Sequence, residues 1–113
     1  MAALLLAVAL AFAAWGVGGV RYTVTLGPPA EWLGSADIDE AGVCHIVIPS
    51  STPYTYLRAV AEHEGSHCLG MGHYGNGIMR ASGIYPWDQI EDEDRARLRA
   101  LRPATPYRLA VPL

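Results

Sequence analysis

The first twenty residues form a single apolar block without a charged side chain. A block of this length can cross a bilayer as a helix. It lacks the basic start of a typical signal peptide, but Ala11-Phe12-Ala13 fits a small-x-small cleavage site. Residues 1–20 therefore have three interpretations: a signal peptide, a signal anchor that also places the chain at a membrane, or the first helix of the folded domain.

Two segments are rich in β-branched and aromatic residues and are predicted to be strands. The first is Arg21 to Leu26, which ends at a Gly-Pro-Pro breaker. The second is Val43 to Ile48, which Pro49 stops. We expect the polar, acidic stretch 30–40 between them to be a loop with a short turn.

A helix is predicted from about Pro53 to Leu69. Thr52 is placed to be its N-cap, and Pro53 suits the first helical position, where a missing N–H costs nothing. Gly70 is suited to end the helix in a left-handed conformation. The stretch 71–87 is rich in glycine and aromatic residues, has no clear period, and is predicted to be a loop.

The charge pattern predicts a second helix near the C-terminus. Acidic residues occupy positions 91–94 and arginines follow up to Arg102, which matches the helix dipole at both ends. Pro103 is expected to end the helix, and the tail to Leu113 to be extended. One face of this helix is predicted to carry Ile90, Asp94, Leu98 and Leu101.

Strands followed by helices predict an α+β fold, with residues 21–113 as one compact domain. The chain has 113 residues, 51% of them hydrophobic, which is enough for one core. Eight arginines face eleven acidic residues, for a net charge of -3, so we expect no nucleic-acid partner. Cys44 and Cys68 either pair in an exported protein or remain buried free thiols.

The densest chemical pattern is HEGSHCLGMGH, at residues 63–73. His63 and His67 lie four apart on the predicted helix, so both imidazoles share a face and can chelate one zinc ion. Glu64 points about 100° further around the helix, where it can reach a water on the metal. After the turn at Gly70, His73 can return as a third ligand.

Three protein ligands leave one zinc position open, as in catalytic rather than structural sites. Zinc activates a water there, and Glu64 is placed as the general base, so the predicted reaction is peptide-bond hydrolysis with one catalytic Zn²⁺. The alternative is a non-catalytic zinc-binding module with a truncated cleft. His45 lies alone on a predicted strand and is interpreted as a surface residue.

The segment resembles the metzincin zinc metallopeptidases, and most closely their matrixin branch, although the chain is unusually short. Gly77-Ile78-Met79 matches the methionine turn of that family, so the resemblance implies that Met79 supports the site without binding zinc. It also implies that Asp94 anchors the last helix near this turn. Ala11-Phe12 and Trp15 match the end of the family's first helix.

The resemblance further implies a minimal zincin fold, with a small twisted sheet, an active-site helix and a C-terminal helix. The partner would be a protein or peptide substrate, and the location secreted or membrane-anchored. By the same analogy, the strand 43–48 would flank the cleft and pair with an extended substrate. Ile84 and Tyr85 would wall the neighbouring pocket, unless Tyr85, Pro86 and Trp87 simply pack beneath the last helix. The family's calcium and structural zinc sites have no counterpart among these residues.

Overall fold

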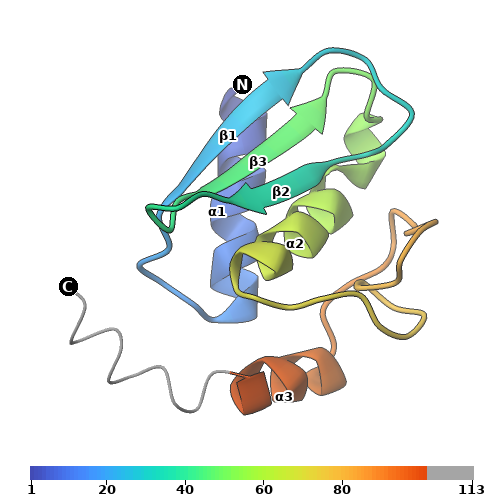
Figure 1. Ribbon diagram of the computed structural model, residues 1–113. Coiled ribbons are helices and arrows are strands. Elements are labelled where there is room, and N and C mark those ends of the chain that lie inside the picture. The colour runs from blue at the N-terminus through green and yellow to red at the C-terminus, as the bar shows by residue number, and fades with distance from the viewer. Residues whose placement is uncertain (102–113) are drawn as a thin grey trace.

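The computed structural model of the protein describes residues 1–101, which form a three-stranded sheet and three α-helices (Figure 1). The expected α+β fold class is confirmed. In chain order the elements are α1 (Ala2–Trp15), β1 (Tyr22–Gly27), β2 (Ser35–Ile38), β3 (Cys44–Pro49), the 3-10 helix η1 (Tyr54–Tyr56), α2 (Leu57–Cys68) and α3 (Asp92–Leu101).

The sheet has the order β1-β3-β2, so β3 is its central strand. β1 runs parallel to β3, and β2 runs antiparallel to it, with Asp37 opposite His45. The turn between β2 and β3 is closed by Asp39, whose carboxylate accepts hydrogen bonds from the backbone N–H groups of Ala41 and Val43, both at 2.9 Å. Such a side-chain bond to the following backbone is typical of aspartate in turns.

The expectation of a loop for residues 30–40 is wrong at β2. Ser35 and Asp37 are polar and exposed, so the strand lacks the apolar face by which sequence patterns reveal strands. Its four residues are held instead by the ladder with β3, a tertiary contact that the local sequence does not encode.

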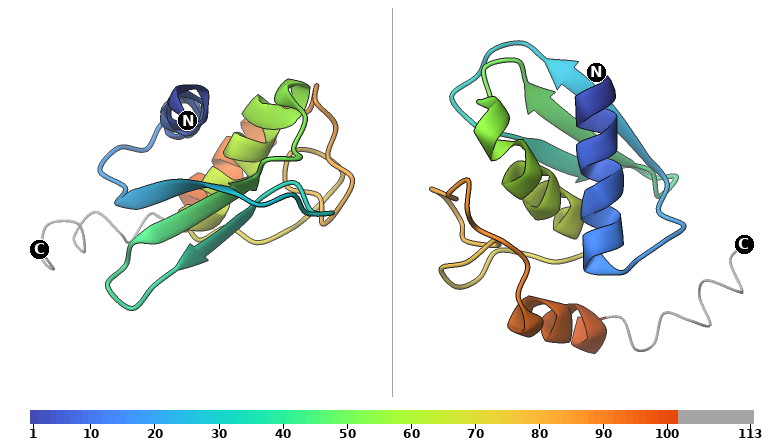
Figure 2. Two further views of the ribbon diagram at one scale, coloured as in Figure 1. Left: turned by 90° about the horizontal axis from the view of Figure 1, so that it is seen from above. Right: turned by 180° about the vertical axis from the view of Figure 1, so that it is seen from behind.

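Both α1 and α2 lie on one face of the sheet, and within residues 1–101 no helix covers the other face (Figure 2). The buried side of α1 packs mainly against α2. Its spacing is helical, and the buried residues are Leu4, Val8, Ala11, Phe12 and Trp15. The Trp15 indole N–H donates to the Glu62 carbonyl at 2.9 Å, which fixes the end of α1 on α2.

The apolar block 1–20 thus forms a helix that is docked on the rest of the fold, with Gly16 as its left-handed C-cap (φ 77°). No helix among residues 1–101 is both long and apolar enough to cross a membrane. The outer face of α1 remains exposed and apolar, as at Leu6, which is 60% exposed.

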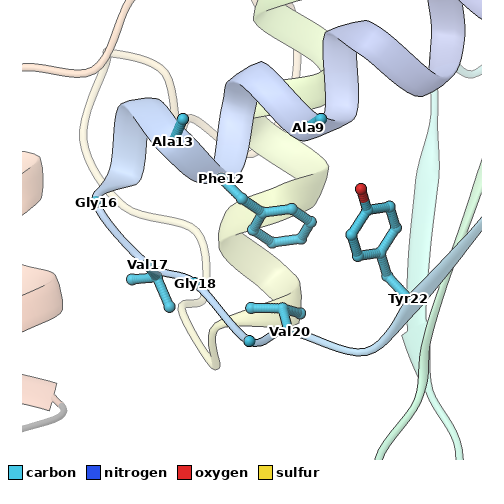
Figure 3. Close-up of a pocket in the computed structure, with 9 residues that line it drawn as sticks. Ala9, Phe12, Ala13, Gly16, Val17, Gly18, Val20 and Tyr22 are labelled. Atoms are coloured by element: carbon cyan, nitrogen blue, oxygen red, sulfur yellow. The ribbon is translucent and has the colours of Figure 1, made fainter.

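An apolar hollow of about 430 Å³ lies between the C-terminal half of α1 and the start of β1 (Figure 3). Phe12 and Tyr22 line it, with ring centroids 4.9 Å apart. Among its lining residues, the Tyr22 hydroxyl is the one polar side-chain group. The hollow therefore has no set of metal ligands.

The helix predicted from Pro53 begins as η1 and becomes α-helical at Leu57. Thr52 does not cap it, because its hydroxyl donates to the Leu33 carbonyl at 2.8 Å instead. At the other end Gly70 takes a left-handed conformation (φ 94°), as expected. The helix start is therefore tied to the segment that leads into β2.

Cys44 and Cys68 form a disulfide, which settles the alternative that the sequence left open. The bond joins the first residue of β3 to the last residue of α2. Because His67 directly precedes Cys68, the disulfide also fixes the helix end that carries this histidine.

The last predicted helix is present as α3, and its buried face contains Asp94 and Leu98, with Ile90 just before it. Leu101 follows Leu98 by three positions at the end of this helix, and its side chain is 50% exposed. Asp94 accepts hydrogen bonds from the Tyr74 hydroxyl and from the N–H of Glu91. The predictions for Arg102, Pro103 and the tail lie outside the described residues.

Candidate metal centre

The three predicted histidines come together at the C-terminal half of α2 and the loop that follows it. His63 and His67 lie one turn apart on α2, and His73 lies in the loop that follows Gly70. One ring nitrogen from each of the three lies within 4.8 Å of the others. The structure therefore brings these side chains together as the sequence spacing predicts.

Backbone carbonyl groups orient two of the rings. The Nδ1 of His63 lies 2.6 Å from the Ile78 carbonyl oxygen, and the Nδ1 of His67 lies 2.7 Å from that of Met71. Because a carbonyl only accepts, each Nδ1 carries the proton, and each Nε2 keeps a lone pair that can bind a metal. Metal-binding histidines are commonly oriented in this way.

The Nε2 atoms face one another at short range. The distance is 3.3 Å from His67 to His63 and 3.1 Å from His67 to His73. Two nitrogens that are each about 2.05 Å from one tetrahedral zinc ion lie about 3.3 Å apart. Converging lone pairs repel unless a cation lies between them, so both the spacing and the donor chemistry fit zinc.

Burial keeps these imidazoles neutral, which is the form that binds a metal. Removal from water lowers the pKa of His63 to about 4, against the opposing effect of its bond to the Ile78 carbonyl. Burial also lowers the pKa of His67. His73, by contrast, is exposed on its loop.

Glu64 is buried beside the histidines and lines the same cavity. Desolvation raises the pKa of its carboxyl group to about 7 in the metal-free protein. The backbone at Gly34 lies directly over it, since a Cβ on Gly34 would come within 3.1 Å of Glu64 Cγ. Glu64 thus faces the cavity under a segment that leaves it little freedom.

Met79 is fully buried and contacts α2, the helix that carries two of the histidines. The Ser66 hydroxyl lies 2.7 Å from Met79 Sδ and 2.6 Å from the carbonyl oxygen of His63. The Met79 carbonyl accepts a hydrogen bond from Tyr74, the residue after His73 and the partner of Asp94. The turn therefore contacts both the helix and the loop that carry the histidines, and Asp94 reaches it through Tyr74.

The cavity around the histidines has a volume of about 760 Å³. One wall is the segment 31–36, which includes the first residues of β2, and the opposite wall is the segment 80–84. The expectation that the strand 43–48 flanks the cleft and pairs with substrate is wrong. β3 has both edges occupied, by β1 and β2, so β2 is the edge strand at the cavity.

The two residues expected to wall the pocket are separated by the structure. Ile84 lines the cavity and is buried. Tyr85 is absent from the lining and stacks on Trp87, with ring centroids 4.6 Å apart and 7° between the planes. Trp87 is 70% exposed, so this pair is not packed beneath the last helix.

His45 lies on the sheet, away from the other three histidines. Its Nε2 lies 2.8 Å from an Asp39 carboxylate oxygen and its Nδ1 lies 2.7 Å from the Thr23 hydroxyl. The interpretation of His45 as a surface residue agrees with its partial exposure.

Sequence reasoning missed Gly34, Arg58 and Asp88. Nothing in the sequence marked Gly34 as a residue of the cavity, because a glycine in a polar stretch can occur for many structural reasons. Arg58 could have been noticed through its spacing of four from Glu62, with which it forms an ion pair. The role of Asp88 depends on contacts with Arg80 and Tyr85 inside an irregular loop.

Comparisons with known proteins give one relevant similarity. The mouse (Mus musculus) matrix metalloproteinase-19 is 35% identical in an alignment of 86 residues, which covers 68% of this chain and 16% of the relative. No family model and no solved structure matches the chain. The chain is thus distantly similar to part of a matrix metalloproteinase, and its three clustered histidines are compatible with zinc binding.

Proposed function

We propose that this chain is a zinc-dependent metalloendopeptidase of the matrixin type. The observation that carries the proposal is the convergence of three Nε2 atoms, with His63 and His67 held by carbonyls, in a cavity that Glu64 also lines. The partial similarity to a matrix metalloproteinase supports the same activity.

In this proposal, His63, His67 and His73 hold one zinc ion through Nε2. Zinc bound there would supply Lewis-acid polarisation of a carbonyl group and a lowered pKa for water. Met79 keeps a structural role, since its sulfur contacts the Ser66 hydroxyl and is not part of the cluster of possible ligands. Loss of any of the three imidazoles is expected to weaken metal binding.

Glu64 is the proposed general base. Its carboxylate accepts the proton of the attacking water and then donates it to the nitrogen of the leaving amine. The raised pKa of this buried carboxyl suits a group that must both take and return a proton near neutral pH. A purely structural zinc site has no use for a buried carboxylate that faces the cavity.

The proposed substrate is an extended segment of a protein or peptide. In the sheet that residues 1–101 form, β2 is an edge strand, and Gly34, Ser35 and Ala36 line the cavity, so an extended chain can add to the outer edge of β2 beside the histidines. The wall at 80–84 then receives a substrate side chain. The disulfide and the relationship to a matrix metalloproteinase support a location outside the cytoplasm.

We also propose that residues 1–20 belong to the catalytic domain, because α1 buries five side chains and bonds to α2 through Trp15. The unit that folds and binds zinc would then begin at α1 rather than at residue 21.

The decisive experiment compares the wild type with Glu64→Gln on a broad peptide library, with zinc content measured for both. We expect about one zinc per chain in each protein and hydrolysis by the wild type alone. His73→Ala serves as the metal-binding test and His45→Ala as its control, because His45 lies apart from the cluster. We expect the zinc affinity of His73→Ala to fall by at least about a hundredfold and that of His45→Ala to stay unchanged.

The outcomes separate the two candidate functions. Zinc binding without hydrolysis by the wild type would refute the enzyme and leave the non-catalytic zinc module. Unchanged zinc affinity in His73→Ala would remove His73 from the ligand set.

A further inference from the structure

The cavity wall formed by residues 80–84 has no regular secondary structure. Ala81, Ser82 and Gly83 are exposed, whereas Ile84 at the end of the wall is buried. An irregular wall of this kind keeps its shape only if its two ends are fixed. The contacts that fix both ends meet at one carboxylate, that of Asp88.

Asp88 closes the turn that follows the wall. Its backbone N–H donates to the Tyr85 carbonyl at 3.1 Å, and its Oδ2 accepts from the Tyr85 N–H at 2.8 Å. Pro86 occupies the second position of this turn, where its fixed φ favours the turn geometry. The C-terminal end of the wall is therefore bound to the Asp88 carboxylate.

The same carboxylate binds the N-terminal end of the wall through its other oxygen. Asp88 Oδ1 lies 3.2 Å from Arg80 Nη2, and the Arg80 guanidinium also donates to the carbonyls of Asn76 and Gly77. The guanidinium carbon of Arg80 lies 4.8 Å from the centre of the Tyr85 ring. The bonds of the Asp88 carboxylate therefore close the backbone segment from Arg80 to Asp88 into a ring, which we call the 80–88 ring. The bond to Arg80 is charge-assisted.

Arg58 attaches this ring to the active-site helix. Its Nη2 donates to the carbonyls of Pro86 at 2.9 Å and Asp88 at 2.7 Å. Its Nη1 forms an ion pair at 2.8 Å with Glu62, the residue before His63. The wall is therefore fixed relative to the helix that carries two of the histidines.

We propose that Asp88 is a positioning residue that holds the wall 80–84 in place and thereby determines which substrate side chain the cavity accepts. The consequence for the substrate rests on the proposed peptidase function. The clamp itself, meaning the bonds of the Asp88 carboxylate to Arg80 and Tyr85, rests on these contacts alone. Only 9% of the Asp88 side chain is exposed, as expected for a carboxylate that keeps two partners. Removing its charge leaves Arg80 without its acidic partner and opens the ring.

The test uses Asp88→Asn, which keeps the shape of the side chain but cannot accept from both partners with two carboxylate oxygens. The matched control is Asp92→Asn, which removes a fully exposed carboxylate from the first turn of α3. Hydrogen exchange of peptides that cover residues 80–88 is measured on the metal-free full chain. We expect about tenfold faster exchange in Asp88→Asn and no change in the control.

Preference is measured without hydrolysis, on the zinc-loaded proteins. The probes are short peptides that carry a metal-chelating hydroxamate and differ only in the side chain that follows it. For the wild type we expect the affinities to depend on the size of this side chain. In Asp88→Asn the spread of affinities should shrink by about tenfold while zinc content stays at the wild-type level.

Unchanged exchange in Asp88→Asn overturns the clamp. Faster exchange with the same order and spread of affinities overturns its role in preference, as does a loss of zinc. Failure of the wild type to hydrolyse peptides refutes the proposed enzyme alone, because neither measurement needs hydrolysis. If Asp88→Asn does not fold, Arg80→Gln opens the same ring from its other end and is measured in the same way.

Discussion

The backbone at Gly34 lies against the side chain of Glu64, so that a methyl group at Gly34 would lie 3.1 Å from Glu64 Cγ and 2.7 Å from a methyl of Val60. The first contact is tighter than ordinary van der Waals packing, and the second cannot occur without movement. Any side chain at position 34 must therefore displace β2, Val60 or the proposed base.

We predict that Gly34→Ala lowers the free energy of unfolding by about 1–3 kcal/mol, the usual cost of overpacking a core. If β2 and Glu64 move together, hydrolysis falls by a larger factor than stability explains, at unchanged zinc content. Denaturant unfolding and peptide cleavage measure the two effects. Gly18→Ala is the control, because a Cβ there meets no atom within 4 Å.

The disulfide between Cys44 and Cys68 is predicted to stabilise the fold by about 3 kcal/mol, as expected for a closed loop of this length. Replacing both cysteines by alanine should therefore shift the urea midpoint downward. A reducing agent should shift the wild type by a similar amount and leave the double variant unaffected. An equal response of both proteins to reduction would argue against this disulfide in solution.

Asp39 is predicted to make the hairpin between β2 and β3 sensitive to acid. The hydrogen bond to His45, followed by that from the Val43 N–H, lowers the pKa of its carboxyl below the usual 3.8. A lowered folded-state pKa means that the contribution to stability is present above the unfolded pKa and is lost as the pH falls through the folded pKa.

Asp39→Asn should accordingly melt at a lower temperature than the wild type near neutral pH, and the difference should shrink as the pH falls below the usual pKa of 3.8 and through the lowered folded-state pKa. Glu40→Gln removes an adjacent exposed acid and should show no such trend. A constant difference between Asp39→Asn and the wild type at all pH values would mean that the charge of Asp39 is not its source.

Phe12 tests whether α1 is part of the domain. Its ring is buried against α2, where a Cβ on Gly65 would lie 3.7 Å from it. Phe12→Ala should cost about 3–5 kcal/mol of unfolding free energy, as for other buried aromatic residues. Leu6→Ala, at an exposed position on the same helix, should cost little.

A chain that begins after residue 20 gives the complementary measurement. If it folds and binds zinc with wild-type affinity, α1 is dispensable and the proposal that residues 1–20 belong to the domain fails.

The parts of the fold that sequence predicts well are those with a local cause. Gly70 ends its helix because few other residues adopt φ near 94°, and the spacing of His63 and His67 needs only a helix to bring the rings together. β2 escaped prediction because Ser35 and Asp37 are exposed and the ladder with β3, rather than a local pattern, holds them extended.

The supports of the site were harder to foresee than the site itself. Thr52 has the sequence context of a helix cap, yet the Leu33 carbonyl takes its hydroxyl, a partner 19 positions away. Asp88 likewise acts on Arg80 and Tyr85 through the shape of an irregular loop. Such contacts depend on how distant segments meet, which one sequence does not specify.

The bond between Cys44 and Cys68 also determines what a single backbone cut would do to the molecule. A cut between these two cysteines, even within α2, leaves both fragments covalently joined, with His63 and His67 in one species. A cut in the loop between Cys68 and His73 instead separates the third histidine from the other two. If the chain cleaves itself, the loop 69–72 is therefore the place where autolysis would end activity.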